Sequence, residues 1–185
     1  MPILREEGEK QGILEVAKLM LISARTAPKS AGIDDLVLAV VHGKEKDEIA
    51  AEMDRIAEER NLKGFARDSK NLRDSEVALL IGVKGPKSFG LNCGACGYQT
   101  CEEFNKVEKK QGLDFVGPTC LFKALDMGIA LCSAAKTASL LNVDNRVMYR
   151  IGTAAQRLKL LPEAHVIMGI PLSASGKSIY FDRTT

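Results

Sequence analysis

Four cysteines constrain this chain more than any other feature of its sequence. Cys93 and Cys96 are separated by two residues, Cys96 and Cys101 by four, and Cys120 follows after eighteen more. Thiolates so close along the chain can point inward around one metal centre, and metal binding then orders the backbone that carries them. The spacing therefore predicts a metalloprotein that folds part of its chain around a metal centre.

The same spacing favours an iron–sulfur cluster over zinc. Four thiolates suit either Zn²⁺ or a [4Fe–4S] cluster, but structural zinc usually uses two short Cys-x-x-Cys pairs, and only Cys93 and Cys96 form one here. Gly94 and Gly97 allow the backbone to curl and to direct N–H groups at sulfur. Structural zinc, disulfides and free thiols stay as alternatives.

The stretch from 92 to 101, with the later Cys120, resembles the four-cysteine domain of Rnf-type electron-transport subunits and related corrinoid proteins. Leu121 stands where that family often has proline after its last ligand. The resemblance implies electron transfer by one [4Fe–4S] cluster, with its ligands at Cys93, Cys96, Cys101 and Cys120.

Composition excludes several other classes of protein. The net charge of +2 does not indicate a nucleic-acid partner, and no apolar run reaches the roughly 18 residues that a membrane span needs. The charged N-terminus has no apolar signal-peptide core, so we expect a cytoplasmic protein. In that compartment five cysteines favour metal binding over disulfides. The length predicts a single domain, 1–185. The cysteines follow an expected strand and precede an expected long helix, so we expect residues 85–120 to form an inserted cluster-binding segment.

Hydrophobic periodicity predicts long helices around a few buried strands, hence a three-layer α/β (α+β) fold. Gly64 is expected to end the second long helix, Thr119 to cap the third, and Asp144 or Asn145 to cap the fourth. A short helix, 102–110, is expected in the cysteine segment. The expected long helices are 9–26, 45–61, 120–141 and 144–160, and the expected strands are 36–41, 77–83, 166–170 and 178–181.

Three segments outside the cysteine region, 24–32, 126–141 and 158–171, resemble the nitroreductase superfamily, whose members bind FMN on a helix-flanked sheet and form homodimers. The first reads Ala-Arg-Thr-Ala-Pro-Lys-Ser-Ala-Gly. This resemblance implies the same fold, a homodimer, and an FMN site contacted by Lys29, Ser30 and Arg183. The whole chain most closely resembles a prokaryotic family of uncharacterised proteins that carry a ferredoxin domain.

The sequence also departs from the nitroreductase pattern. The N-terminus lacks the Arg-x-Ser-x-Arg motif that grips the flavin phosphate, and Gly32-Ile33-Asp34 replaces the expected asparagine. Three functions therefore stay open: an FMN-dependent reductase of unknown substrate, a flavin-free electron carrier or redox sensor, and a structural zinc-binding interaction protein. The expected partner is a redox protein or a small-molecule electron acceptor, with no role for nucleic acid or membrane. No catalytic residue is assigned.

Other candidate residues are interpreted as structural. Cys132 shares a helix face with Gly128 and Ser139, so we expect it to pack there as a small hydrophobe. His42 and His165 flank strands without the partner spacing of a metal site. Gly176–Ser178 lacks the earlier glycine of a phosphate-binding loop.

Overall fold

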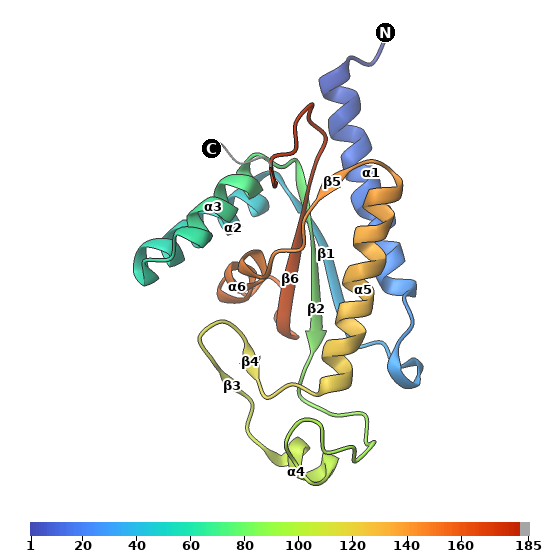
Figure 1. Cartoon of the computed structure of the whole chain (residues 1–185), viewed down its shortest axis with the longest axis vertical. Coiled ribbons are helices and arrows are strands. Elements are labelled where there is room, and N and C mark those ends of the chain that lie inside the picture. Colours follow the sequence, from blue (N-terminus) through green and yellow to red (C-terminus); the bar gives the residue numbers. More distant parts are fainter. Residues whose placement is uncertain (182–185) are drawn as a thin grey trace.

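A four-stranded antiparallel sheet forms the centre of the molecule (Figure 1). The structure is a computed structural model that describes residues 1–181. The sheet order is β1 (Leu36–His42), β2 (Val77–Lys84), β6 (Ala164–Ser173) and β5 (Asp144–Asn145). Strand β2 is central and buried from Val77 to Val83, which explains its unbroken apolar sequence, because layers of helices cover both of its faces.

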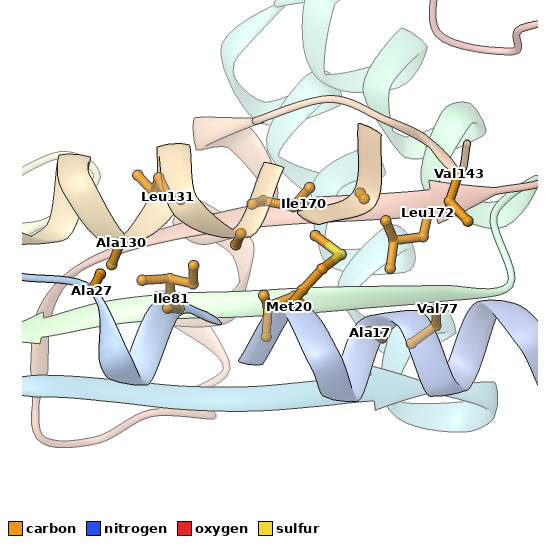
Figure 2. Packing of buried hydrophobic residues seen from close by; sticks show 14 of the residues in the cluster. Ala17, Met20, Ala27, Val77, Ile81, Ala130, Leu131, Val143, Ile170 and Leu172 are labelled. Atoms are coloured by element: carbon orange, nitrogen blue, oxygen red, sulfur yellow. The ribbon is translucent and has the colours of Figure 1, made fainter. Parts of the chain in front are cut away.

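Two long helices, α1 (Arg5–Thr26) and α5 (Leu121–Leu140), cover one face of the sheet (Figure 1). Met20 of α1 and Leu131 of α5 pack with Ile81 of β2 and Ile170 of β6 in one core cluster (Figure 2). The alternate residues of β2 that face this layer are Val77, Leu79, Ile81 and Val83. The period of two in the strand thus supplies a continuous apolar surface to the helices.

Three shorter helices, α2 (Gly43–Arg60), α3 (Lys63–Arg73) and α6 (Tyr149–Arg157), cover the other face. Ala78 and Leu80 of β2 join this second core, together with Phe65 of α3 and Ile151 of α6. Two packed helical layers around one sheet confirm the expected three-layer architecture.

Two predicted helix boundaries on this face are wrong. Helix α2 ends at Arg60, and Asn61 closes it in the left-handed conformation with φ of 51°. Gly64 lies inside the next helix, α3, which the sequence did not predict. Its missing side chain leaves room for Arg150, because an added Cβ would lie 2.8 Å from the guanidinium carbon. The residues Asp144–Asn145 form the short strand β5 instead of a helix cap, and α6 begins only at Tyr149.

Two further expectations are corrected. The Thr119 hydroxyl donates to the carbonyl of Val116 and does not cap α5, which Cys120 precedes without a side-chain cap. No strand forms within 178–181; this stretch turns, and Tyr180 is buried in the second core. A short segment next to a long strand can bury its aromatic residue without pairing, so the apolar pattern alone did not distinguish the two outcomes.

Residues 85–120 connect β2 to α5 and lie beyond the end of the sheet, at the bottom of Figure 1. We call this stretch the cysteine segment. It contains α4 (Cys101–Lys106), shorter than expected, and a hairpin of β3 (Lys110–Gln111) and β4 (Val116–Gly117). The 3₁₀ turn η1 (Ser30–Gly32) follows α1. Within residues 1–181, no helix combines the length and the apolar character required to cross a membrane.

Candidate metal centre

All four cysteines of the motif line one pocket, which we call the cysteine pocket. About 320 Å³ of space lies between its walls, including space open to solvent. Cys93, Cys96 and Cys101 come from the cysteine segment, and Cys120 comes from the residue preceding α5. The remaining side-chain walls are largely apolar or aromatic and include Phe89, Leu91, Tyr98, Leu121 and Phe122.

Left-handed backbone conformations bend the chain around the first two cysteines. Gly94 and Gly97 have φ angles of 71° and 88°, and Asn92 has φ of 49°. The N–H of Gly97 donates to the carbonyl of Gly94 at 2.9 Å and closes a tight turn. Glycine adopts these angles without the penalty that a Cβ atom brings, so the two glycines explain how Cys93 and Cys96 reach one pocket.

Reciprocal hydrogen bonds hold the third cysteine beside the first turn. The backbone N–H of Cys101 donates to Asn92 Oδ1 at 2.8 Å, and the N–H of Asn92 donates to Cys101 Sγ at 3.3 Å. Thr100 caps α4 by accepting from the N–H of Glu103, whose carboxylate accepts from the N–H of Gln99. This capping pattern fixes the start of α4 and therefore the position of the sulfur.

Hydrogen-bond donors around Cys101 favour its thiolate. The Ser88 hydroxyl beside the sulfur, together with the N–H groups of Asn92, Gly90 and Leu91, lowers the pKa of the Cys101 thiol. Among the described residues Ser88 Oγ makes no hydrogen bond, so its proton is free to turn toward this sulfur. Such donors stabilise negative charge on sulfur in a metal-bound thiolate as well.

The four cysteines differ in exposure. Cys120 is 5% exposed, Cys96 and Cys101 are half-buried, and Cys93 is exposed. The pocket therefore has a buried floor at the start of α5 and an open edge at Cys93.

The thiols of the cysteine pocket do not form a site for a single metal ion within the described residues. Within residues 1–181, no three His, Cys, Asp or Glu side chains converge closely enough to hold one metal ion. A [4Fe–4S] cluster takes one thiolate on each of its four irons, whereas the four ligands of Zn²⁺ all contact one atom. All four thiols line the cysteine pocket. Their role as ligands stays a prediction.

A small aromatic core supports the cysteine segment from within. Phe104 is fully buried, and the ring of Tyr98, which lines the pocket, meets it edge-on at 5.7 Å between centroids. The Lys109 ammonium lies 3.7 Å from the centre of the Phe104 ring and donates to the Phe104 carbonyl. Arg60 of α2 ties the segment to the scaffold, because it pairs at 2.5 Å with Asp114 in the turn of the β3–β4 hairpin.

Sequence reasoning missed the polar groups that organise this pocket. Ser88 and Asn92 bind or face sulfur only because the chain doubles back, and no spacing rule connects either residue with Cys101. Lys123 was missed as well; it is 3% exposed, although lysine is normally a surface residue. Its position three residues after Cys120, one helical turn away, is the one signal in the sequence that could have drawn attention to it.

The proposed flavin contacts at Lys29 and Ser30 are already engaged within the chain. The N–H and hydroxyl of Ser30 both donate to the buried carboxylate of Asp126, the hydroxyl at 2.8 Å. Lys29 Nζ donates to the carbonyls of Arg25 and Ala27, at 2.6 and 2.8 Å. Burial and the charge of Arg25 lower the pKa of Lys29. Arg183 lies outside the described residues, so the flavin contacts stay a prediction.

Cys132 does not pack in the way predicted. It is exposed on α5, and an added Cβ on its neighbour Gly128 would meet no atom within 4 Å. The face that carries these small residues points away from the core of the chain. Small residues at helical spacing indicate only that another element could pack closely against this face of the helix. The sequence did not show whether an element of the same chain does so.

Solved structures similar to this one define its fold class. The FMN-dependent nitroreductase NfnB from Mycobacterium smegmatis, in complex with NADPH, matches with a TM-score of 0.58 and 13% identity, over 88% of this chain and 78% of that one. An FMN-dependent nitroreductase from Clostridium difficile matches with a TM-score of 0.52 and 17% identity, over 88% of this chain and 76% of that one. The protein therefore has a nitroreductase-like fold.

The family follows from sequence comparison. Residues 116–183 match the profile of a family described as "Uncharacterized protein containing a ferredoxin domain (DUF2148)". An uncharacterised protein of Archaeoglobus fulgidus is 48% identical over 183 residues, which cover 99% of this chain and 98% of that protein. The chain belongs to this ferredoxin-domain family.

Proposed function

We propose that this protein is an iron–sulfur redox protein that holds a [4Fe–4S] cluster in the cysteine pocket. The observation that carries the proposal is the convergence of Cys93, Cys96 and Cys101 with the distant Cys120 on one pocket. The ferredoxin-domain family and the N–H groups around Cys101 support it. When bound, the cluster would accept and donate one electron at a time.

The chain supplies the environment for this chemistry. Four thiolates would hold the cluster, and the donors at Asn92 and Ser88 would stabilise negative charge on one of them. Phe89 and Phe122 line the pocket and would place apolar side chains beside the cluster. The exposed edge at Cys93 offers a redox protein or a small electron acceptor the shortest approach.

Protein purified without oxygen, then assayed for iron and acid-labile sulfide, tests the proposal. We expect about four irons and four sulfides per chain. Cys96→Ser should lose them, and Cys132→Ala should keep them, because Cys132 lies outside the pocket. A Cys96→Ser protein with full iron and sulfide would contradict the assignment. Stoichiometric zinc without sulfide would favour a structural zinc protein instead.

An FMN-dependent reductase is the second candidate function, because the solved structures with this fold include FMN-dependent nitroreductases. The contacts of Lys29 and Ser30 inside the chain favour the flavin-free electron carrier or sensor. Flavin released by heat from the same preparation and measured by fluorescence distinguishes the two. One FMN per chain would establish the reductase candidate, and iron with sulfide but no flavin would establish the carrier.

We also propose a homodimer that uses the outer face of α5. This face carries exposed apolar side chains one helical turn apart, namely Leu121, Leu125, Ile129 and Cys132. Leu125 is 50% exposed and Ile129 44%. An apolar stripe of this kind is typical of a protein interface, and a second copy offers a matching stripe about a two-fold axis.

Sedimentation velocity tests the dimer. Leu125→Glu combined with Ile129→Glu should convert the dimer to a monomer, because each change places a charge in the apolar contact. Leu113→Glu is the matched control, since Leu113 is 76% exposed and lies away from α5 in the β3–β4 hairpin. A wild-type monomer, or a double variant that stays dimeric, would contradict the proposal.

A further inference from the structure

A buried ion pair lies next to the cysteine pocket. Lys123 Nζ lies 2.7 Å from Asp35 Oδ2, and the side chains of the two residues are 4% and 23% exposed. Asp35 precedes β1, and its carbonyl accepts from the N–H of Lys84 at the end of β2. The pair therefore joins the first turn of α5 to the end of the sheet from which the cysteine segment leaves.

The ammonium of Lys123 also lies beside a wall of the pocket. It lies 5.6 Å from the centre of the Phe89 ring, and Phe89 is a wall of the cysteine pocket. Lys123 follows Cys120 by three residues, so the two share one side of the helix start. This buried cation therefore lies against a residue that lines the space bounded by the thiols.

The position of Lys123 is electrostatically unfavourable unless negative charge lies nearby. Desolvation penalises a buried ammonium, and the N-terminal end of a helix carries partial positive charge. Asp35 supplies one compensating charge. A thiolate-bound cluster in the pocket that Phe89 lines would supply more, and its one-electron reduction would add a further negative charge.

We propose that Lys123 and Asp35 together set the reduction potential of the cluster, as positioning residues that act through the field inside the protein. Lys123 stabilises the reduced, more negative cluster, and Asp35 opposes this effect. The inference rests on the proposed function, because it requires a cluster in the pocket. The two partners of this ion pair therefore have opposite effects on the reduction potential.

A redox titration with dithionite and mediators, followed by EPR, tests the inference. Lys123→Met should shift the midpoint potential to more negative values, and Asp35→Asn should shift it to more positive values. Lys123→Arg keeps the charge and should stay close to wild type. Lys136→Met is the control for net charge, since Lys136 lies thirteen residues further along α5, about 20 Å away at 1.5 Å per residue.

The opposite signs separate this role from a purely structural one. Loss of a structural ion pair would loosen the same contact in both variants, so both potentials would move in the same direction or stay unchanged. Either result overturns the inference and leaves the cluster assignment intact. If Lys123→Met does not assemble, a positive shift in Asp35→Asn together with an unchanged potential in Lys123→Arg still supports the inference. An unchanged or more negative potential in Asp35→Asn refutes it. Wild-type protein without iron and sulfide would refute the proposed function itself.

Discussion

Gly152 lies where α6 comes closest to the sheet, and replacing it with alanine tests the packing of that layer. A Cβ atom at this position would lie 1.7 Å from the carbonyl oxygen of Ile167 and 2.4 Å from its carbon. Both atoms belong to the backbone of β6, so no side-chain rotation can relieve the clash. To reach even a tight normal contact of 3.4 Å, the helix and the strand would have to separate by about 1.7 Å.

Separation of this size opens the second core cluster. Overpacking of a well-packed interior costs about 1–3 kcal/mol. This contact belongs at the upper end of that range, because the Cβ atom is attached directly to the helix backbone and the opposing atoms belong to the backbone of β6. Alanine recovers about 1 kcal/mol of helix propensity relative to glycine. We therefore expect Gly152→Ala to lower the free energy of unfolding by about 2 kcal/mol.

Urea unfolding followed by far-ultraviolet circular dichroism measures this loss. Gly12→Ala is the matched control, because Gly12 is an exposed residue within α1 whose added Cβ would meet no atom within 4 Å. The control should gain about 0.5–1 kcal/mol from propensity alone. If Gly152→Ala were as stable as wild type while Gly12→Ala gained stability, the close approach of α6 and β6 would be disproved.

Three further predictions concern buried side chains. Burial raises the pKa of Tyr180 from 10.0 to about 12, so the folded chain keeps a proton that the unfolded chain releases between these values. The free energy of unfolding should therefore fall as pH rises through this window, by about 2–3 kcal/mol in all, and Tyr180→Phe should flatten the fall in urea titrations. Asp126→Ala should cost about 1–3 kcal/mol, because the Ser30 N–H loses its partner, while Ser30→Ala should cost only about 1 kcal/mol; equal costs in thermal unfolding would contradict this contact. Phe104→Ala should speed the release of iron to a chelator, because the ring forms the core beneath the cysteine segment, and an unchanged rate of release would argue against that support.

Local sequence signals predicted the elements that depend on local physics. The apolar run of β2 predicted a strand covered on both faces, and the structure confirms it. The expected helix end at residue 26 is confirmed, because Ala27 precedes Pro28 and the residue before proline avoids the helical conformation. Gly94 and Gly97 correctly indicated the curled backbone around the first two cysteines.

Other elements depend on contacts that no local signal reveals. Asn61 adopts the left-handed conformation that ends α2, whereas the sequence suggested Gly64, since glycine is the commoner residue at that position. The strand β5 exists because Asp144–Asn145 pairs with Leu172 and Ser173 of β6, residues distant in sequence. The spacing of small residues around Cys132 is compatible with a helix face turned to the core or to solvent. Only the placement of α5 on the sheet decided that Cys132 is exposed.

The sequence by itself determined that four thiols occur at cluster spacing, that glycines let them turn inward, and that apolar strands alternate with long helices. These properties are local, because they follow from residue type and separation along the chain. Only the tertiary structure decided that Cys120 meets the other three cysteines in one pocket and that Ser88 and Asn92 face Cys101. It also placed the Lys123–Asp35 pair beside that pocket. Such contacts join residues whose positions are fixed by the packing of whole helices on the sheet, so the chain has to fold before the chemistry of the pocket exists.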